Sequence, residues 1–329
     1  MCPWNIPHEP PPDYEALLKA LPAEASDPVL KQHVVTKAIF RQFAAMAGKY
    51  VNLVVPYDVL EGREEKATGP KGCGVETGFI PYGSVSAESV WKTVEDNLTE
   101  AINAARQDRL HGNPVLEQTL KDCIALHMTR SYRYMTIHAG AAARAAESLL
   151  GNMMVNHPGL LEAEFHRRTG LYATGPEGLA YVLARPLEDW YERMRGPYAR
   201  VSIESTFGRI REIFRQYEIE VGHATGGSEL LISDSPAISY QLSSDNSTVE
   251  AINLAIGDSN GTLMPVAPDC IVGISPAARV SHLSRAQIDT FNHIQVLSAA
   301  RYVYYRPESD LRAFAEVARA AREGQSASA

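Results

Sequence analysis

The sequence contains few cysteines and none of the short motifs that identify common nucleotide-binding or zinc-peptidase sites. Its four cysteines lie far apart among 329 residues, and no two have the C-x-x-C spacing of a zinc knuckle. We therefore predict reduced thiols in a cytoplasmic protein rather than a disulfide framework. Walker A, dinucleotide-binding glycine and H-E-x-x-H motifs are absent too, which excludes the sites that those motifs build.

Long apolar runs and an excess of basic charge are also missing. No apolar stretch reaches the roughly 18 residues needed to cross a bilayer, and the N-terminus lacks the basic and apolar regions of a signal peptide. The net charge of -8 argues against a protein that coats DNA, although it leaves room for a local basic cleft. We therefore expect no membrane partner.

Composition and periodicity predict one α+β domain with a short arm before it and a tail after it. Residues 1–25 form an extended arm, because five prolines between positions 3 and 12 deny it helix and ladder hydrogen bonds. Within the domain, residues 26–323, we expect residues 26–217 to be mostly helical. Residues 218–323 are rich in strand-forming segments, which predicts an antiparallel or mixed sheet with helices on it. Residues 324–329 are predicted to be disordered.

Two segments give the sharpest local predictions. In the helix expected over residues 86–108, apolar side chains recur four residues apart, which is typical of one helix face. Between the strands expected at 218–223 and 228–233, Thr225-Gly226-Gly227 is a hairpin signal.

Several segments resemble one bacterial family. Gln32-His33-Val34-Val35 through Phe40-Arg41-Gln42-Phe43 is similar to the Q-H-x-x-P-x-x-x-L-x-x-F opening of the domain of unknown function numbered 4238. The resemblance covers about residues 30–305 in order and implies a fold and a set of polar positions, but no established activity. The later segments that carry it are the strand Val54–Asp58, the helix around Glu95, Leu126–Arg130, Leu231–Pro236 and Met264–Pro268.

The chain departs from the family pattern at two positions. Thr36 stands where the family usually has proline, and Ser235 stands where it usually has asparagine. Both departures concern the shape of the backbone more than the chemistry of a site.

His33 and Glu95 are the first candidate catalytic residues. An imidazole near a helix start is a candidate general base, because its unperturbed pKa lies near neutral pH. The alternative is that His33 donates to a carbonyl and orders the preceding arm. Glu95 borders an apolar helix stripe, and Glu88 lies on the same face, so the pair is a candidate site for a hard divalent metal. The alternative for both carboxylates is an ordinary ion-paired face.

Arg130 and Asp234 complete the candidate catalytic set. Arg130 and Arg133 share a helix face, and paired guanidinium groups suit phosphate or carboxylate, unless they only form structural bridges. Asp234 follows a strand, where it either presents a carboxylate at the sheet edge or closes an Asx turn. We assign Arg133 to substrate binding, together with two residues that adjoin the catalytic candidates, Gln32 and Ser235.

Three functional hypotheses follow. The first is a hydrolase that acts on a phosphodiester or another anionic substrate, either a small molecule or a nucleic acid, with a divalent metal as the candidate cofactor. The second is a non-catalytic binding or sensor protein of a defence system, in which the same residues form a buried network. The third is a ribonuclease toxin, because Arg133 and His138 fit the R-x-x-x-x-H motif of helical ribonucleases. The sequence predicts no oligomeric state.

Overall fold

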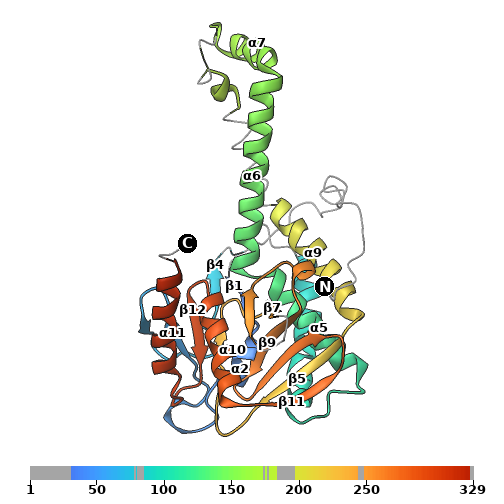
Figure 1. Cartoon of the computed structure of the whole chain (residues 1–329), viewed down its shortest axis with the longest axis vertical. Helices are drawn as coiled ribbons and strands as arrows, with labels where there is room; N and C mark the ends of the chain where they lie inside the picture. The colour runs from blue at the N-terminus through green and yellow to red at the C-terminus, as the bar shows by residue number, and fades with distance from the viewer. Residues whose placement is uncertain are drawn as a thin grey trace.

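The computed structural model describes residues 31–77, 79, 85–172, 175, 178–183, 197–243 and 248–326. Figure 1 shows a body of sheets and helices from which α6 (Tyr132–Asn156) projects, with α7 (Pro158–Thr169) at its far end. The predicted arm, residues 1–25, lies outside the described residues. The predicted tail is described as far as Ser326, the last residue of α11 (Leu311–Ser326). Within these ranges, no helix is both long and apolar enough to cross a membrane.

The largest sheet has six strands in the order β11-β5-β10-β9-β7-β8. β11 runs parallel to β5, and the other neighbours are antiparallel, which confirms the mixed sheet expected in this part of the chain. Every residue of β9 is buried, as expected for a strand covered on both faces. The strands are β5 (Glu218–Ala224), β7 (Ile238–Leu242), β8 (Val249–Ile252), β9 (Gly261–Ala267), β10 (Cys270–Ser275) and β11 (Arg279–Leu283).

Of the two smaller sheets, the four-stranded one joins N-terminal strands to C-terminal ones, whereas the two-stranded one lies within the N-terminal part. The four-stranded sheet has the order β3-β2-β12-β6, and β12 pairs antiparallel with both β2 and β6. The two-stranded sheet pairs β1 with β4. The strands are β1 (Lys31–His33), β2 (Val55–Asp58), β3 (Arg63–Glu64), β4 (Val75–Thr77), β6 (Ile232–Ser233) and β12 (Tyr302–Tyr305).

The main core lies between the six-stranded sheet and a layer of helices. It contains fully buried aromatic and aliphatic side chains such as Phe40, Phe43, Leu98 and Phe214. α5 packs against α4 and α9, and it begins at Asn113, whose side chain accepts the Leu116 amide. The helices of this layer are α2 (Lys37–Phe43), α3 (Val85–Asp96), α4 (Leu98–Arg106), α5 (Pro114–Thr129) and α9 (Pro197–Arg215).

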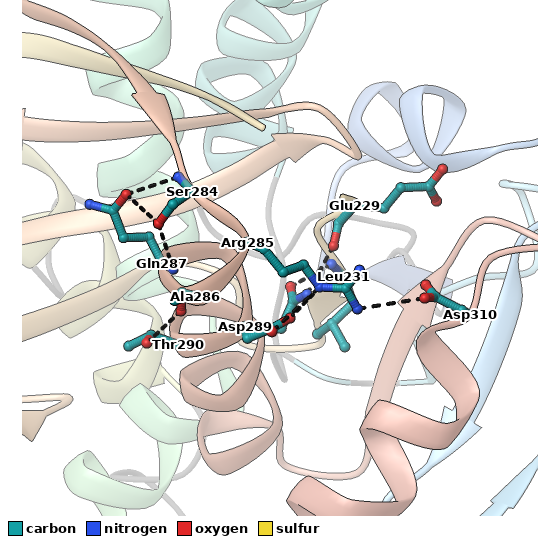
Figure 2. A network of polar contacts seen from close by, with 10 residues as sticks. Glu229, Leu231, Ser284, Arg285, Ala286, Gln287, Asp289, Thr290 and Asp310 are labelled. Atoms are coloured by element: carbon teal, nitrogen blue, oxygen red, sulfur yellow. Dashed lines mark hydrogen bonds and ion pairs between the residues drawn. The ribbon is translucent and has the colours of Figure 1, made fainter. Parts of the chain in front are cut away.

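The C-terminal helices α10 (Arg285–Ser298) and α11 cover the four-stranded sheet and part of the six-stranded one. A capping box between Ser284 and Gln287 fixes the start of α10. Figure 2 shows Arg285 reaching both Asp289 on the same helix and Asp310 just before α11. Polar side chains farther along α10, Asn292 and Gln295, bind the backbone that enters and leaves β6.

Helices in the N-terminal and central parts together with the C-terminal mixed sheet confirm the predicted α+β class. Two local predictions differ from the structure. The helix expected over residues 86–108 is divided at Asn97 into α3 and α4. The hairpin expected around Thr225-Gly226-Gly227 is wrong, because β5 and β6 belong to different sheets. The turn itself is present, with positive φ at both glycines, but β5 already has β10 and β11 on its two sides.

Candidate functional site

His33 ends β1 and is half-buried, with its Nε2 3.3 Å from the carbonyl oxygen of Lys71. Burial lowers the pKa of His33 to about 4, and the charges of Lys37 and Arg130 act in the same direction. The imidazole is therefore neutral at pH 7. Because a neutral ring donates to the Lys71 carbonyl through Nε2–H, its Nδ1 is an unprotonated acceptor.

Arg130 and Glu95 lie where α3 meets the C-terminal end of α5. The guanidinium carbon of Arg130 lies 4.4 Å from the centre of the Trp91 ring, and both residues are buried. Glu95 is half-buried on α3, and its charge adds to burial in raising the pKa of the Cys123 thiol on α5. Glu95 therefore faces α5 rather than open solvent. The side chain of Glu88, its candidate partner for a metal, lies outside the described residues.

Asp234 follows β6 and is buried, and its carboxylate accepts three backbone N–H groups. Oδ1 accepts the amide of Ala300 at 2.7 Å, and Oδ2 accepts those of Arg301 at 2.8 Å and Tyr302 at 2.9 Å. Burial raises the pKa of Asp234 to about 6, although the three amide donors act in the opposite direction. The carboxylate therefore shapes the turn before β12.

The three candidate substrate-binding residues lie in different surroundings. Gln32 is buried on β1, opposite Glu76 of β4. The amide of Ser235 donates to the Ser233 hydroxyl at 3.3 Å, and the Ser235 hydroxyl oxygen is buried without a hydrogen-bond partner. Arg133 lies on the first turn of α6, where its guanidinium donates to the carbonyl of Asn253.

Arg133 and His138 both lie on α6 but point in different directions. Residues five apart on an α-helix are separated by about 140° around its axis, so the two side chains do not share a face. Arg133 reaches the backbone after β8, whereas the imidazole of His138 stacks on the Tyr134 ring at 6.3 Å between centroids.

The α5–α6 junction is electrostatically close to both His33 and Asp234. The charge of Arg130 acts on His33, and two residues farther along the chain the phenol of Tyr132 lies within the field of Asp234. Asp234 and Tyr132 line a cavity that the sequence did not predict.

This cavity, which we call the tyrosine pocket, has a volume of about 450 Å³. Tyr132 enters it from the first turn of α6, Tyr302 and Tyr304 from β12, Glu76 from β4, and Asp234 from the turn after β6. Its other lining residues are Val34, Pro56, Glu65, Lys66, Thr68, Gly72, Gly74, Val75 and Arg301.

The three tyrosines are held in distinct ways. Burial and the Glu76 carboxylate both raise the pKa of Tyr132, so its phenol stays protonated. The hydroxyl of Tyr304 accepts the amide of Gly74 at 3.2 Å, and burial raises its pKa as well. The Tyr302 ring carries a cation above it, since the guanidinium carbon of Arg301 lies 5.1 Å from the ring centre.

Ion pairs decide which charges in the pocket face a ligand. Arg301 binds the fully buried carboxylate of Asp58, with Nε 2.8 Å from Oδ2. Glu65 is paired with Arg63 at 3.2 Å, and Lys66 is exposed at the rim. The carboxylates of Glu76 and Asp234 therefore dominate the charge on the inner wall.

The described residues offer neither a clustered metal site nor a reactive thiol. No group of three His, Cys, Asp or Glu side chains within the described ranges has the geometry to hold a metal ion. Burial raises the pKa of both Cys73 and Cys270 to about 12 and that of Cys123 well above its ordinary value. These thiols are protonated at neutral pH and are poor nucleophiles.

One sequence signal could have revealed part of the pocket. In Tyr302-Val303-Tyr304-Tyr305, alternation along a strand places Tyr302 and Tyr304 on the same face. Tyr132 and Glu76 were not identified from the sequence. Tyr132 lies between Arg130 and Arg133, which were chosen as candidates instead, and Glu76 lies in a stretch rich in Gly, Lys and Glu that resembles a loop.

Comparison with known proteins gives a family but no function. A family model described as "Protein of unknown function (DUF4238)" matches residues 31–309, most of the chain. No curated protein and no solved structure matches this chain.

Proposed function

Because the chain belongs to the DUF4238 family of proteins of unknown function, we propose its function from the pocket itself: it is a binding protein for a small ligand that carries a protonated amine or guanidinium. The tyrosine pocket is the binding site. This proposal corresponds to the second hypothesis drawn from the sequence, a binding or sensor protein.

The observation that carries this proposal is the combination of three tyrosines and two carboxylates around one cavity. A cation over a tyrosine ring gains about 0.5–2 kcal/mol, and charge-assisted hydrogen bonds to carboxylates give it direction. The volume of about 450 Å³ lies within the usual range for small-molecule sites. The pose of Arg301 over Tyr302 shows that one of these rings already accepts a guanidinium.

The charge balance favours a cation over an anion. An anionic ligand would meet Glu76 and Asp234 on the inner wall, while Arg301 is engaged by Asp58. A cationic ligand would gain from both carboxylates. Glu76 is the one that a ligand reaches more readily, because Asp234 already binds three amides whereas Glu76 binds one phenol, that of Tyr132.

We expect amines and guanidinium compounds to raise the melting temperature of the full-length protein. The probes are agmatine, arginine methyl ester and spermidine, each compared with succinate and inorganic phosphate by thermal-shift assay and calorimetry. Glu76→Gln weakens the binding of the best cation by about ten- to a hundredfold, since it removes a charge-assisted hydrogen bond worth about 1.5–3 kcal/mol.

Glu162→Gln on α7 is the matched control, because this exposed glutamate lies on the projecting helices, away from the pocket. It should leave the affinity unchanged. Stronger stabilisation by the anions than by the cations, or equal affinities of Glu76→Gln and the unmodified protein, would refute a cation site.

A second candidate function is the hydrolase predicted from the sequence, with His33, Glu95, Arg130 and Asp234 as its catalytic set. The observation that favours it is the neutral His33 with an unprotonated Nδ1 in the field of Arg130. A neutral imidazole is the form that a general base requires, and a guanidinium stabilises developing negative charge.

If this hydrolase activity exists, His33→Gln lowers the turnover of bis(p-nitrophenyl) phosphate by about 100-fold, the usual range for loss of a general base. The assay is run with and without Mg²⁺ or Mn²⁺, and the melting temperature of the variant is measured beside it. His166→Gln, at an exposed position on α7, is the control. The hydrolase candidate is refuted if the unmodified protein shows no turnover, or if His33→Gln and His166→Gln turn over at the same rate. Either result leaves the test of cation binding unaffected.

A further inference from the structure

A second concave surface lies between β8 and α10 and shares no lining residue with the tyrosine pocket. This groove has a volume of about 1040 Å³. Its walls come from the strand pair β7–β8 on one side and from α10 on the other, while Arg133 of α6 and Arg322 of α11 complete its lining.

The strand wall is the edge of the six-stranded sheet. β8 is the last strand in the order and pairs with β7 alone among the described strands. The amide of Asn253, just after β8, donates to the carbonyl of Ser239 in β7, and backbone groups alternate in direction along a strand. The N–H of Ile252 therefore points away from β7, toward the position of a further strand.

β8 contains neither lysine nor proline. It is short, with one exposed charge at Glu250, and its pairing with β7 shifts register between Gln241 and Leu242. Edge strands are commonly blunted by lysine, proline or inward-pointing charges. β8 reads Val249-Glu250-Ala251-Ile252, and its three apolar residues are half-buried, which leaves apolar surface on the groove side.

The helical wall has an apolar part that is continuous with the core, next to the polar side chains of Gln287, Thr290 and His293. Phe291, Ile294 and Leu297 lie three residues apart and thus on one face of α10, and Ile294 is buried beneath the other two. Tyr240 and Leu242 of β7 line the floor. This surface extends the core cluster between the sheet and α10 out to the solvent.

We propose that this groove binds an extended peptide segment by strand addition to β8. The peptide backbone pairs with the outward-facing groups of β8, and alternate side chains enter the apolar groove beside α10. The open edge of β8 supplies the backbone hydrogen bonds that this mode of recognition needs, and the groove beside α10 supplies the side-chain pockets.

The charges around the groove select an acidic peptide. Three basic side chains line it, Arg133, His293 and Arg322, against one carboxylate, Glu250. His293 is half-buried and forms no hydrogen bond or ion pair with the described part of the chain. A peptide with an acidic side chain or a terminal carboxylate therefore complements the groove.

A phage-displayed library of random peptides, selected on the full-length protein, tests this proposal. We expect enriched peptides in which apolar residues alternate and at least one acidic residue is present. Thr290→Glu, at an exposed position on the groove wall, weakens their binding by about tenfold through repulsion of the acidic group. Ala286→Glu adds the same charge at an exposed position of α10 that does not line the groove, and its affinity should stay within about twofold of that of the unmodified protein.

Hydrogen exchange separates strand addition from other modes of binding. Bound peptide should slow exchange in the segment 248–254, because the N–H of Ile252 gains a partner. N-methylation of alternate peptide amides should weaken binding by about tenfold or more, since it removes ladder hydrogen bonds. The proposal is overturned if no peptide is enriched, if Thr290→Glu and Ala286→Glu bind equally well, or if the enriched peptides bind as helices without protecting 248–254.

Discussion

Asp234→Ala lowers the free energy of unfolding by about 4 kcal/mol, because three backbone amides lose their shared acceptor. The amides of Ala300, Arg301 and Tyr302 converge on this one carboxylate, which is 2% exposed. Each buried N–H left without a partner costs about 1–3 kcal/mol, and water from the neighbouring pocket offsets part of the total. Urea unfolding followed by circular dichroism measures the change.

Two further variants test whether the loss of stability in Asp234→Ala comes from the three unpaired backbone amides. Asp234→Asn keeps one acceptor oxygen but turns an NH₂ group toward some of the same donors. Its loss of unfolding free energy should therefore be about half that of Asp234→Ala. Asp269→Ala removes a half-exposed carboxylate paired with Arg106 and should cost no more than about 1 kcal/mol. A loss below about 1 kcal/mol for Asp234→Ala would mean that the three amides find other acceptors.

Acid weakens the fold through His127, by about 2 kcal/mol between pH 7 and pH 5. His127 is buried on α5. Its Nδ1 donates to the carbonyl of Cys123 at 2.8 Å, and its Nε2 accepts the amide of Thr36 at 3.2 Å. Burial lowers the pKa of His127 to about 4, from 6.5. Its contribution to stability is present above pH 6.5 and is lost as the pH falls toward 4, because the unfolded chain takes up the proton first.

Comparison with His127→Gln isolates this residue from the other titrating groups. His33 titrates in the same direction. Asp234, whose pKa is raised, acts in the opposite direction, since its stabilising protonated form is lost as the pH rises through about 6. These groups are shared by both proteins, so the difference in unfolding free energy between them should narrow by about 2 kcal/mol from pH 7 to pH 5. A difference that is constant with pH would show that His127 titrates normally.

The bond from Thr36 to His127 also explains one departure from the family pattern. Thr36 stands where the resemblance leads one to expect proline, and a proline has no N–H to donate. In this chain, the threonine lets the backbone before α2 bind directly to α5. The sequence could identify the departure but not its partner, which lies 91 residues away.

Local patterns predicted the fold class well, and they predicted the candidate site only in part. The C-terminal mixed sheet follows from short-range composition and periodicity. The tyrosine pocket does not, because β4, α6 and β12 contribute its walls from distant parts of the chain. Asp234 was identified as a polar residue after a strand, but its three amide partners lie more than sixty residues later. The wrong prediction of a hairpin also results from long-range contacts, since the neighbours of β5 in the sheet are β10 and β11 rather than the next strand along the chain.

The pairing of β2 with β12 limits when the four-stranded sheet can form during synthesis. Asp58 pairs with Tyr302, so β2 leaves the ribosome about 240 residues before its partner strand. At roughly 5–20 residues per second, the open edge of β2 waits about ten to fifty seconds for β12. Arg301, which neutralises the buried Asp58, arrives in the same interval. The four-stranded sheet is therefore completed only after β12 has been synthesised, and until then an unpaired strand edge and the Asp58 carboxylate are exposed to aggregation.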